Sequence, residues 1–208
     1  METITIDAYS IHELSQDAAE YAIEQEREER SQHKHPWADD AYDSLRKFCE
    51  WFDIEVREHP HSWTGEVWLQ NYDLESWLES NKLYGLQGER LRRWIDARYG
   101  SVLREPKVYG DKYGKGAKRT SRIMTRETDC PFTGYCMDYT LIEPVRNYIT
   151  KGVPKNWTYV DVMDECISAF NRAITSEYEY WLSDEAIIED FEANDALFTE
   201  NGRRTYHL

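Results

Sequence analysis

The sequence lacks the features that define several classes of protein. No stretch approaches the roughly 18 consecutive apolar residues that a membrane span requires. The opening METITIDAYS has neither the basic nor the apolar region of a signal peptide. With 10 Gly and 6 Pro among 208 residues, collagen-like and low-complexity architectures are excluded. We therefore expect a globular protein of the cytoplasm that has no membrane partner.

Motifs of known catalytic sites are also missing. The chain contains no nucleophile elbow, no HExxH, no Rossmann glycine set, no kinase motif and no P-loop. Pairs of carboxylates carry no signal for hydrolysis, because 40 acidic residues make such pairs common by chance. We expect a protein that is not an enzyme, has no catalytic residues and needs no cofactor, while a small metal- or nucleotide-dependent enzyme stays open as an alternative.

Cysteine is scarce, with four residues, and without a signal peptide disulfides are not expected. Cys49 and Cys166 lie at apolar positions of helical patterns and are interpreted as core residues. Cys130 and Cys136 are weak candidates for metal ligands, since five intervening residues exceed the usual two to four of structural zinc sites. The other candidates for zinc ligands are two His-x-His pairs, His33/His35 and His59/His61. The expectation is no metal.

Acidic residues outnumber basic ones by 40 to 25, which gives a net charge of −15, yet 14% aromatic residues exclude a disordered acidic chain. The charge is uneven: residues 1–60 carry −10, residues 101–128 carry +5 and residues 161–208 carry −9. Acidic flanks repel phosphates, so direct nucleic-acid binding by the surface as a whole is unlikely on electrostatic grounds.

Apolar periodicity predicts a mostly helical α+β fold. Helices are expected after Ser15, over 38–52, 73–81 and 87–99, near 141–151, from about 158 to 182, and after Ser183. The pattern that starts near Thr158 is apolar on two sides, which places this helix at the centre of the fold.

Short strands are expected at 3–9, at 54–56 and at 122–128, and they predict a small antiparallel sheet. Asn201-Gly202 favours a tight turn and predicts a C-terminal β-hairpin. Residues 1–208 are expected to form a single compact domain with a basic flexible loop at about 104–120.

Two charged segments are candidate binding surfaces. Carboxylates held along helices can imitate a phosphate backbone, and the candidate partner-binding residues are Glu185, Glu189, Asp190, Glu192, Glu24 and Glu28. Glu185, Glu189 and Glu192 are spaced to share one helical face. In the basic loop, the candidates for phosphate contacts are Lys112, Lys115, Lys118 and Arg119, with Tyr109 and Tyr113 as candidates for stacking on bases.

Three stretches resemble a family of bacteriophage and prophage proteins that is often labelled "antitoxin of toxin–antitoxin stability system". Residues 4–22 resemble its opening strand and "ELSxxA" segment. Residues 130–145, CPFTGYCMDYTLIEPV, resemble its Cys-Pro-Leu-Thr-Gly-Tyr signature and the helix that follows. Residues 177–202 resemble its "SDE…EAN…FTxxG" ending. Residues of about 60–120 match nothing in the family.

The resemblance implies a phage-encoded accessory protein in the cytoplasm of an infected bacterium, and it carries over no catalytic residues. Acidic phage proteins of this kind imply counter-defence: binding and inhibiting a host nucleoprotein machine, in the manner of an anti-CRISPR or anti-restriction DNA mimic. The implied partner is a host or phage protein, within a nucleic-acid-binding complex. An antitoxin-like protein that neutralises a partner toxin is the second reading.

Overall fold

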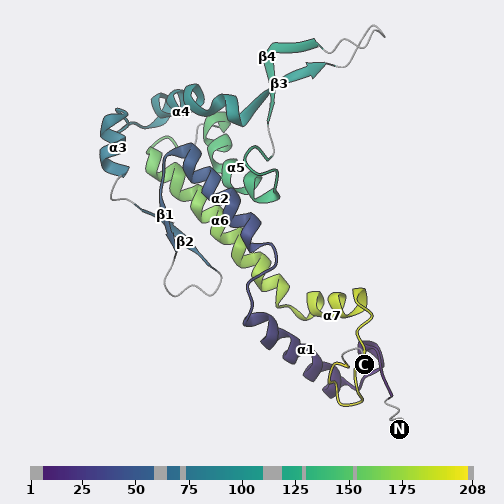
Figure 1. Cartoon of the computed structure of the whole chain (residues 1–208). Coiled ribbons are helices and arrows are strands. Elements are labelled where there is room, and N and C mark those ends of the chain that lie inside the picture. The colour runs from purple at the N-terminus through teal and green to yellow at the C-terminus, as the bar shows by residue number, and fades with distance from the viewer. Residues whose placement is uncertain are drawn as a thin grey trace. The chain divides into compact units, whose positions relative to one another are not determined.

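The computed structural model describes residues 7–58, 65–70, 74–109, 119–127, 130–151 and 154–205 (Figure 1). The elements follow the order η1 (Ile11–Glu13), α1 (Gln16–Ser31), α2 (Ala38–Phe52), β1 (Val56–Glu58), β2 (Val67–Leu69), α3 (Leu74–Ser80), α4 (Gly88–Leu103), β3 (Arg104–Tyr109), β4 (Arg119–Glu127), α5 (Cys136–Lys151), α6 (Tyr159–Trp181) and α7 (Asp184–Ala193). The strands form antiparallel pairs, β1 with β2 and β3 with β4. The prediction of a mostly helical α+β protein with antiparallel strands is confirmed.

The chain divides into two compact units. Unit 1 consists of Met1–Ala38 and Thr175–Leu208, and unit 2 consists of Asp39–Ile174. Each unit is described by itself below, and the organisation into a single domain stays a prediction. None of the described helices combines the length and the apolar character that crossing a membrane would need.

Helices α2 and α6 supply much of the core of unit 2. The apolar seam of α6 is buried along most of its length, and Phe170 has no exposed surface. On α2 the buried residues Ala41, Leu45 and Phe48 recur at helical spacing, and this helix has the bounds that the sequence predicts. Its end is fixed to α6, because the buried Tyr159 hydroxyl donates a hydrogen bond of 2.6 Å to the Phe52 carbonyl.

Strand β2 is an element that the sequence did not predict. It pairs with β1 in the register Val56↔Leu69, Arg57↔Trp68 and Glu58↔Val67. Its edge is attached to α6 through the Asn171 amide, which accepts from the Val67 N–H at 3.0 Å and donates to the Val67 carbonyl at 2.7 Å. A polar helix residue therefore provides hydrogen-bond partners at this edge. A three-residue strand is too short to show a periodic apolar pattern in the sequence.

Residues 104–109 form a strand, where the sequence predicted a flexible loop or an irregular hairpin tip. They constitute β3 and pair with β4, with a register irregularity between Pro106 and Val108. The expected basic loop is thus the end of a two-stranded ribbon, and its residues 110–118 lie outside the described residues.

Among its described residues, unit 1 has two isolated β-bridges. Residues 1–6 of the expected N-terminal strand lie outside the described residues, and Tyr9 forms an isolated antiparallel bridge with Phe198. Phe198 also bridges Arg204, and the chain reverses over residues 199–203; within the described residues this bridge is not part of a named strand pair, so the predicted C-terminal hairpin is not supported.

The turn that contains Gly202 lies directly against α1. The Gly202 N–H donates to the Thr199 carbonyl at 2.8 Å, and Gly202 has a φ of 81°. A Cβ on this residue would lie 2.1 Å from the Ala18 carbonyl oxygen, so only glycine fits against the helix. The apolar centre of unit 1 contains Phe191 and Phe198, whose rings are 4.9 Å apart at 69°.

Phe170→Ala tests the central position of α6 in unit 2. Removing a fully buried ring should lower the free energy of unfolding by about 3–5 kcal/mol. For a chain of this length that corresponds to a fall in melting temperature of at least about 6 °C in a calorimetric scan. A melting temperature within about 2 °C of the wild type would contradict the assignment.

Candidate partner-binding surface

The fold gathers the two acidic ends of the chain into one unit. Unit 1 has 72 residues, with 18 Asp and Glu against 5 Lys and Arg, a net charge of −13. Unit 2 has 22 acidic against 20 basic residues, a net charge of −2. Most of the net negative charge therefore belongs to about a third of the sequence, and this unit carries the candidate binding surface.

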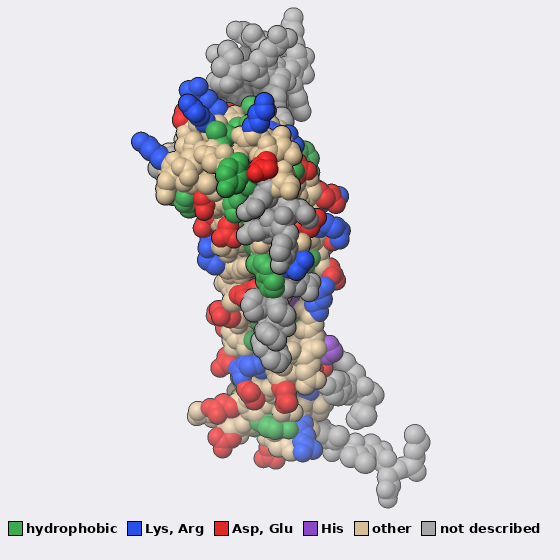
Figure 2. All heavy atoms as spheres, turned by 90° about the vertical axis from the view of Figure 1, so that its left-hand side faces the viewer, with side chains coloured by type: hydrophobic (Ala, Val, Ile, Leu, Met, Phe, Trp, Pro, Cys, Tyr) green, Lys and Arg blue, Asp and Glu red, His purple; other side chains and the backbone are tan. Residues whose placement is uncertain are grey.

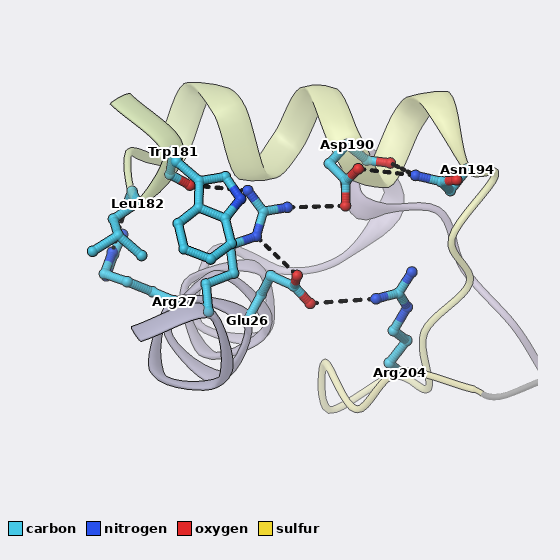
Figure 3. A network of polar contacts seen from close by, with 8 residues as sticks. Glu26, Arg27, Trp181, Leu182, Asp190, Asn194 and Arg204 are labelled. Carbon is cyan, nitrogen blue, oxygen red and sulfur yellow. Dashed lines mark hydrogen bonds and ion pairs between the residues drawn. The ribbon is translucent and has the colours of Figure 1, made fainter. Parts of the chain in front are cut away.

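A single buried arginine organises this unit. The Arg30 side chain, 8% exposed, donates from Nε to Glu26 at 2.9 Å and from Nη2 to Asp190 of α7 at 2.9 Å. Its Nη1 donates to the Trp181 carbonyl at 2.9 Å, at the C-terminal end of α6, and its guanidinium lies 5.8 Å from the Trp181 ring centroid. One cation thereby joins α1, the last turn of α6 and α7 (Figure 3).

Glu26 extends this network to the C-terminal segment. Its side chain is 14% exposed and accepts from Arg30 through one oxygen. Its other oxygen lies 3.3 Å from Arg204, whose guanidinium lies 5.6 Å from the Phe191 ring centroid (Figure 3). A largely buried carboxylate between two arginines is balanced by charge and by hydrogen bonds, which offsets its cost of desolvation.

Arg27 connects α1 to the start of α7. Its guanidinium binds Glu24 and Asp184, and its Nε donates to the Leu182 carbonyl at 3.0 Å. Ser183 caps α7 by accepting from the Ala186 N–H at 3.2 Å. The carboxylates of Glu24 and Asp184 therefore share one cation within the unit.

His35 contacts the same tryptophan as Arg30. Its ring centroid lies 4.7 Å from that of Trp181 and 4.0 Å from that of Trp37. Burial, and secondly the charge of Arg30, lower the pKa of His35. The ring therefore adds no second positive charge beside Arg30 at neutral pH.

The outward side of α6 and α7 presents a group of carboxylates around an exposed tyrosine. The Tyr180 ring is 46% exposed, and its hydroxyl donates to Glu189 at 2.9 Å. This hydrogen bond to Glu189 raises the pKa of Tyr180, and the charges of Glu185 and Glu177 act in the same direction. We call Glu177, Tyr180, Glu185, Glu189 and Glu192 the acidic face.

Three predicted residues lie on the acidic face as the helical spacing indicates. Glu185, Glu189 and Glu192 are exposed, and Glu192 contacts the exposed His12. The expectation that Asp190 points outward with them is wrong. Asp190 is half-buried and bound to Arg30, since the next position along the helix turns about 100° towards α1.

The predicted residues of α1 divide in the same way. Glu28 is exposed, whereas the exposed Glu24 is paired with Arg27. The uncompensated negative charge of α1 near Glu24 is therefore smaller than the run of acidic residues in the sequence indicates.

One face of the molecule carries carboxylates and cations with only small, separate hydrophobic areas among its described residues (Figure 2). The large exposed hydrophobic residues belong to different elements, such as Tyr21 on α1, Trp51 on α2 and Trp68 on β2. Broad apolar patches mark obligate interfaces. The surface in this view is instead suited to contacts through charge.

The cysteine-containing segment 130–136 in unit 2 is organised by a carboxylate. Asp138, in the first turn of α5, has no exposed surface and accepts from the backbone N–H groups of Phe132, Thr133 and Gly134 at 2.8–3.1 Å. The Thr133 hydroxyl lies 2.8 Å from that of Ser44 on α2. These contacts hold the loop to the core and give it a structural role.

The weak metal candidates are not brought together as a cluster in the described part of the chain. Cys130 is half-buried, while Cys136 begins α5 with a side chain outside the description. His59 and His61 lie outside the described residues, and His33 and His35 follow α1. Within the described ranges there is no group of three or more side chains suited to a metal.

The predicted phosphate contacts fall at the end of the β3–β4 ribbon. Lys112, Lys115, Lys118 and the stacking candidate Tyr113 lie outside the described residues. Arg119 begins β4 and lies opposite Tyr109 of β3 in the register.

Sequence reasoning missed the residues that organise each unit. Arg30, whose partner Asp190 lies far along the chain, looks like one more charge in a polar helix. Tyr180 looks like a core aromatic, and Asp138 gives a signal only through its place two residues after the start of α5. Each acts through contacts that no local pattern encodes.

Comparisons with protein-family models, with curated proteins and with solved structures gave no match. The surface is therefore interpreted from its own chemistry.

Asp138→Asn tests whether the carboxylate organises the cysteine loop. The amide keeps the shape of the side chain but points donors at backbone N–H groups, so the free energy of unfolding should fall by about 2–3 kcal/mol in chemical denaturation. As a control, Asp161→Asn changes an exposed carboxylate that accepts from Thr158 at 2.7 Å and should cost about 1 kcal/mol or less. If D138N is as stable as the wild type and loses that stability when zinc is chelated, a metal holds the loop.

Proposed function

We propose that this chain is a phage-encoded binding protein whose acidic unit occupies a basic nucleic-acid-binding site of a host defence complex. The observation that carries the proposal is the concentration of charge, −13 on the 72 residues of unit 1 against −2 on unit 2. The resemblance of three stretches to phage and prophage proteins supports the counter-defence setting. Inhibition then results from competition with the nucleic acid, and no catalytic step is required.

The spacing of the carboxylates supports mimicry of a phosphate backbone. Glu185, Glu189 and Glu192 extend over about 10 Å of helix axis, or roughly one charge per 5 Å. One DNA strand carries about one charge per 3.4 Å of axis. The acidic face thus presents negative charge at a density of the same order, on one side of a helix.

Rigid placement of the charges is the second support. An acidic tail would lose conformational entropy on binding, which weakens its affinity. In unit 1, by contrast, Ile187 and Phe191 anchor α7 from its apolar side, and Asp190 fastens it to Arg30. The carboxylates of the acidic face are therefore held in place before a partner arrives.

The acidic face also contains an element that favours arginine in the partner. A guanidinium can stack on an aromatic ring while it binds carboxylates. The half-exposed ring of Tyr180 lies beside Glu189, within the field of Glu185 and Glu177. Nucleic-acid channels are rich in arginine, which makes them suitable partners for this arrangement.

The triple variant Glu185→Lys, Glu189→Lys and Glu192→Lys tests the proposal. It should abolish binding to the partner complex, since it replaces attraction by repulsion at the contact. The fold should remain as stable as the wild type, because like charges at this spacing repel by a few tenths of a kcal/mol per pair and their relief offsets the lost contacts. Binding is measured by calorimetric titration with a complex captured from a bacterial lysate and purified.

Two control variants make the result specific. Glu79→Lys, Glu143→Lys and Asp164→Lys alter exposed residues of unit 2 and produce the same change in net charge. Glu24→Lys with Glu28→Lys alters α1 and should weaken binding less than the triple variant. Equal affinity of the wild type and the acidic-face variant would contradict the proposal, provided that circular dichroism shows an intact fold.

A further inference from the structure

The register of the β3–β4 ribbon separates its charges along its length. Next to the helices, Arg104 lies opposite Glu127 and Glu105 lies opposite Arg126. Directly opposite positions of unlike charge stabilise an antiparallel pair. The base of the ribbon is therefore balanced, with two acidic and two basic residues.

Beyond this base, all charged residues of the described strands are basic. Lys107 of β3 and Arg119 and Arg122 of β4 follow the balanced pairs, and the described outer residues include no Asp or Glu. Tyr109 lies opposite Arg119 in the register.

We infer that the outer half of the β3–β4 ribbon binds the phosphodiester backbone of nucleic acid, with duplex DNA as the form that fits it. This goes beyond the proposed function, which concerns unit 1 and a protein partner. It also departs from the expectation that direct nucleic-acid binding is unlikely, which rested on the charge of the whole surface. The register shows instead that the basic residues of the ribbon are concentrated at its outer half.

The shape of the element favours duplex DNA over an acidic protein surface. The major groove of B-DNA is about 12 Å wide and admits a two-stranded antiparallel ribbon. Phosphates line both edges of that groove, so cations on both strands of the ribbon find partners at once. The irregular register between Pro106 and Val108 increases the local twist of the ribbon, which helps it follow a groove.

The test measures binding of the full chain to a labelled 20-base-pair duplex by fluorescence anisotropy at several salt concentrations. The wild type should bind with an affinity that falls as salt rises. The variant Lys107→Gln, Arg119→Gln and Arg122→Gln should bind at least about tenfold more weakly at low salt, and its dependence of log K on log salt should be shallower by about 2–3, for three lost phosphate contacts.

The control removes three cations elsewhere in unit 2. Lys82→Gln, Arg90→Gln and Lys155→Gln neutralise exposed residues and change the net charge by the same amount, so they should leave the salt dependence unchanged. The charge-conserving variant Lys107→Arg, Arg119→Lys and Arg122→Lys should bind as the wild type does. Absence of salt-dependent binding by the wild type, or equal loss in both neutralised variants, overturns the inference.

Further probes distinguish the forms of negative charge. Single-stranded DNA and duplex RNA of equal length share the phosphodiester chemistry, and weaker binding of both supports a fit to the major groove. Equally tight binding of polyglutamate would overturn the inference, because the ribbon would then recognise charge alone. Failure here leaves the acidic face untouched, since neither the probe nor the variants involve unit 1.

Discussion

The buried guanidinium of Arg30 is the interaction on which the arrangement of unit 1 depends. It binds carboxylates of α1 and α7 and the last carbonyl of α6, so three helical segments converge on one cation (Figure 3). Removing such a cation would leave Glu26 and Asp190 without their shared partner in a partly buried place. The same contact sorts the acids of α7, because it draws Asp190 inward while Glu189 and Glu192 stay exposed.

The two units differ in how they handle charge. In unit 1, arginines from α1 and the C-terminal segment neutralise a few acids and leave the others exposed, which produces a surface of one sign. In unit 2, acidic and basic residues nearly balance, and the β3–β4 ribbon carries a local excess of basic residues. We propose that the acidic unit binds a basic protein site and that the cationic ribbon binds nucleic acid. The two proposals are compatible, because a nucleoprotein complex offers both kinds of partner.

Helices with strong apolar periodicity were predictable from the sequence. The bounds of α2 were correct, and the buried seam of α6 followed from residues spaced three and four apart. Elements fixed by distant polar contacts were not predictable: β2 depends on Asn171, the cysteine loop on Asp138, and the C-terminal turn on the fit of Gly202 against Ala18. The exposed carboxylates of the candidate site followed from helical spacing, whereas the inward turn of Asp190 required knowledge of Arg30.

Competition between this protein and nucleic acid for the captured complex is the most direct measurement of the central claim. The account predicts mutually exclusive binding, in which the apparent Kd of the protein rises in proportion to the concentration of the nucleic acid that the complex holds, with the slope set by the affinity of that nucleic acid. An apparent Kd that does not change as nucleic acid is added would show that the acidic face does not occupy the nucleic-acid site.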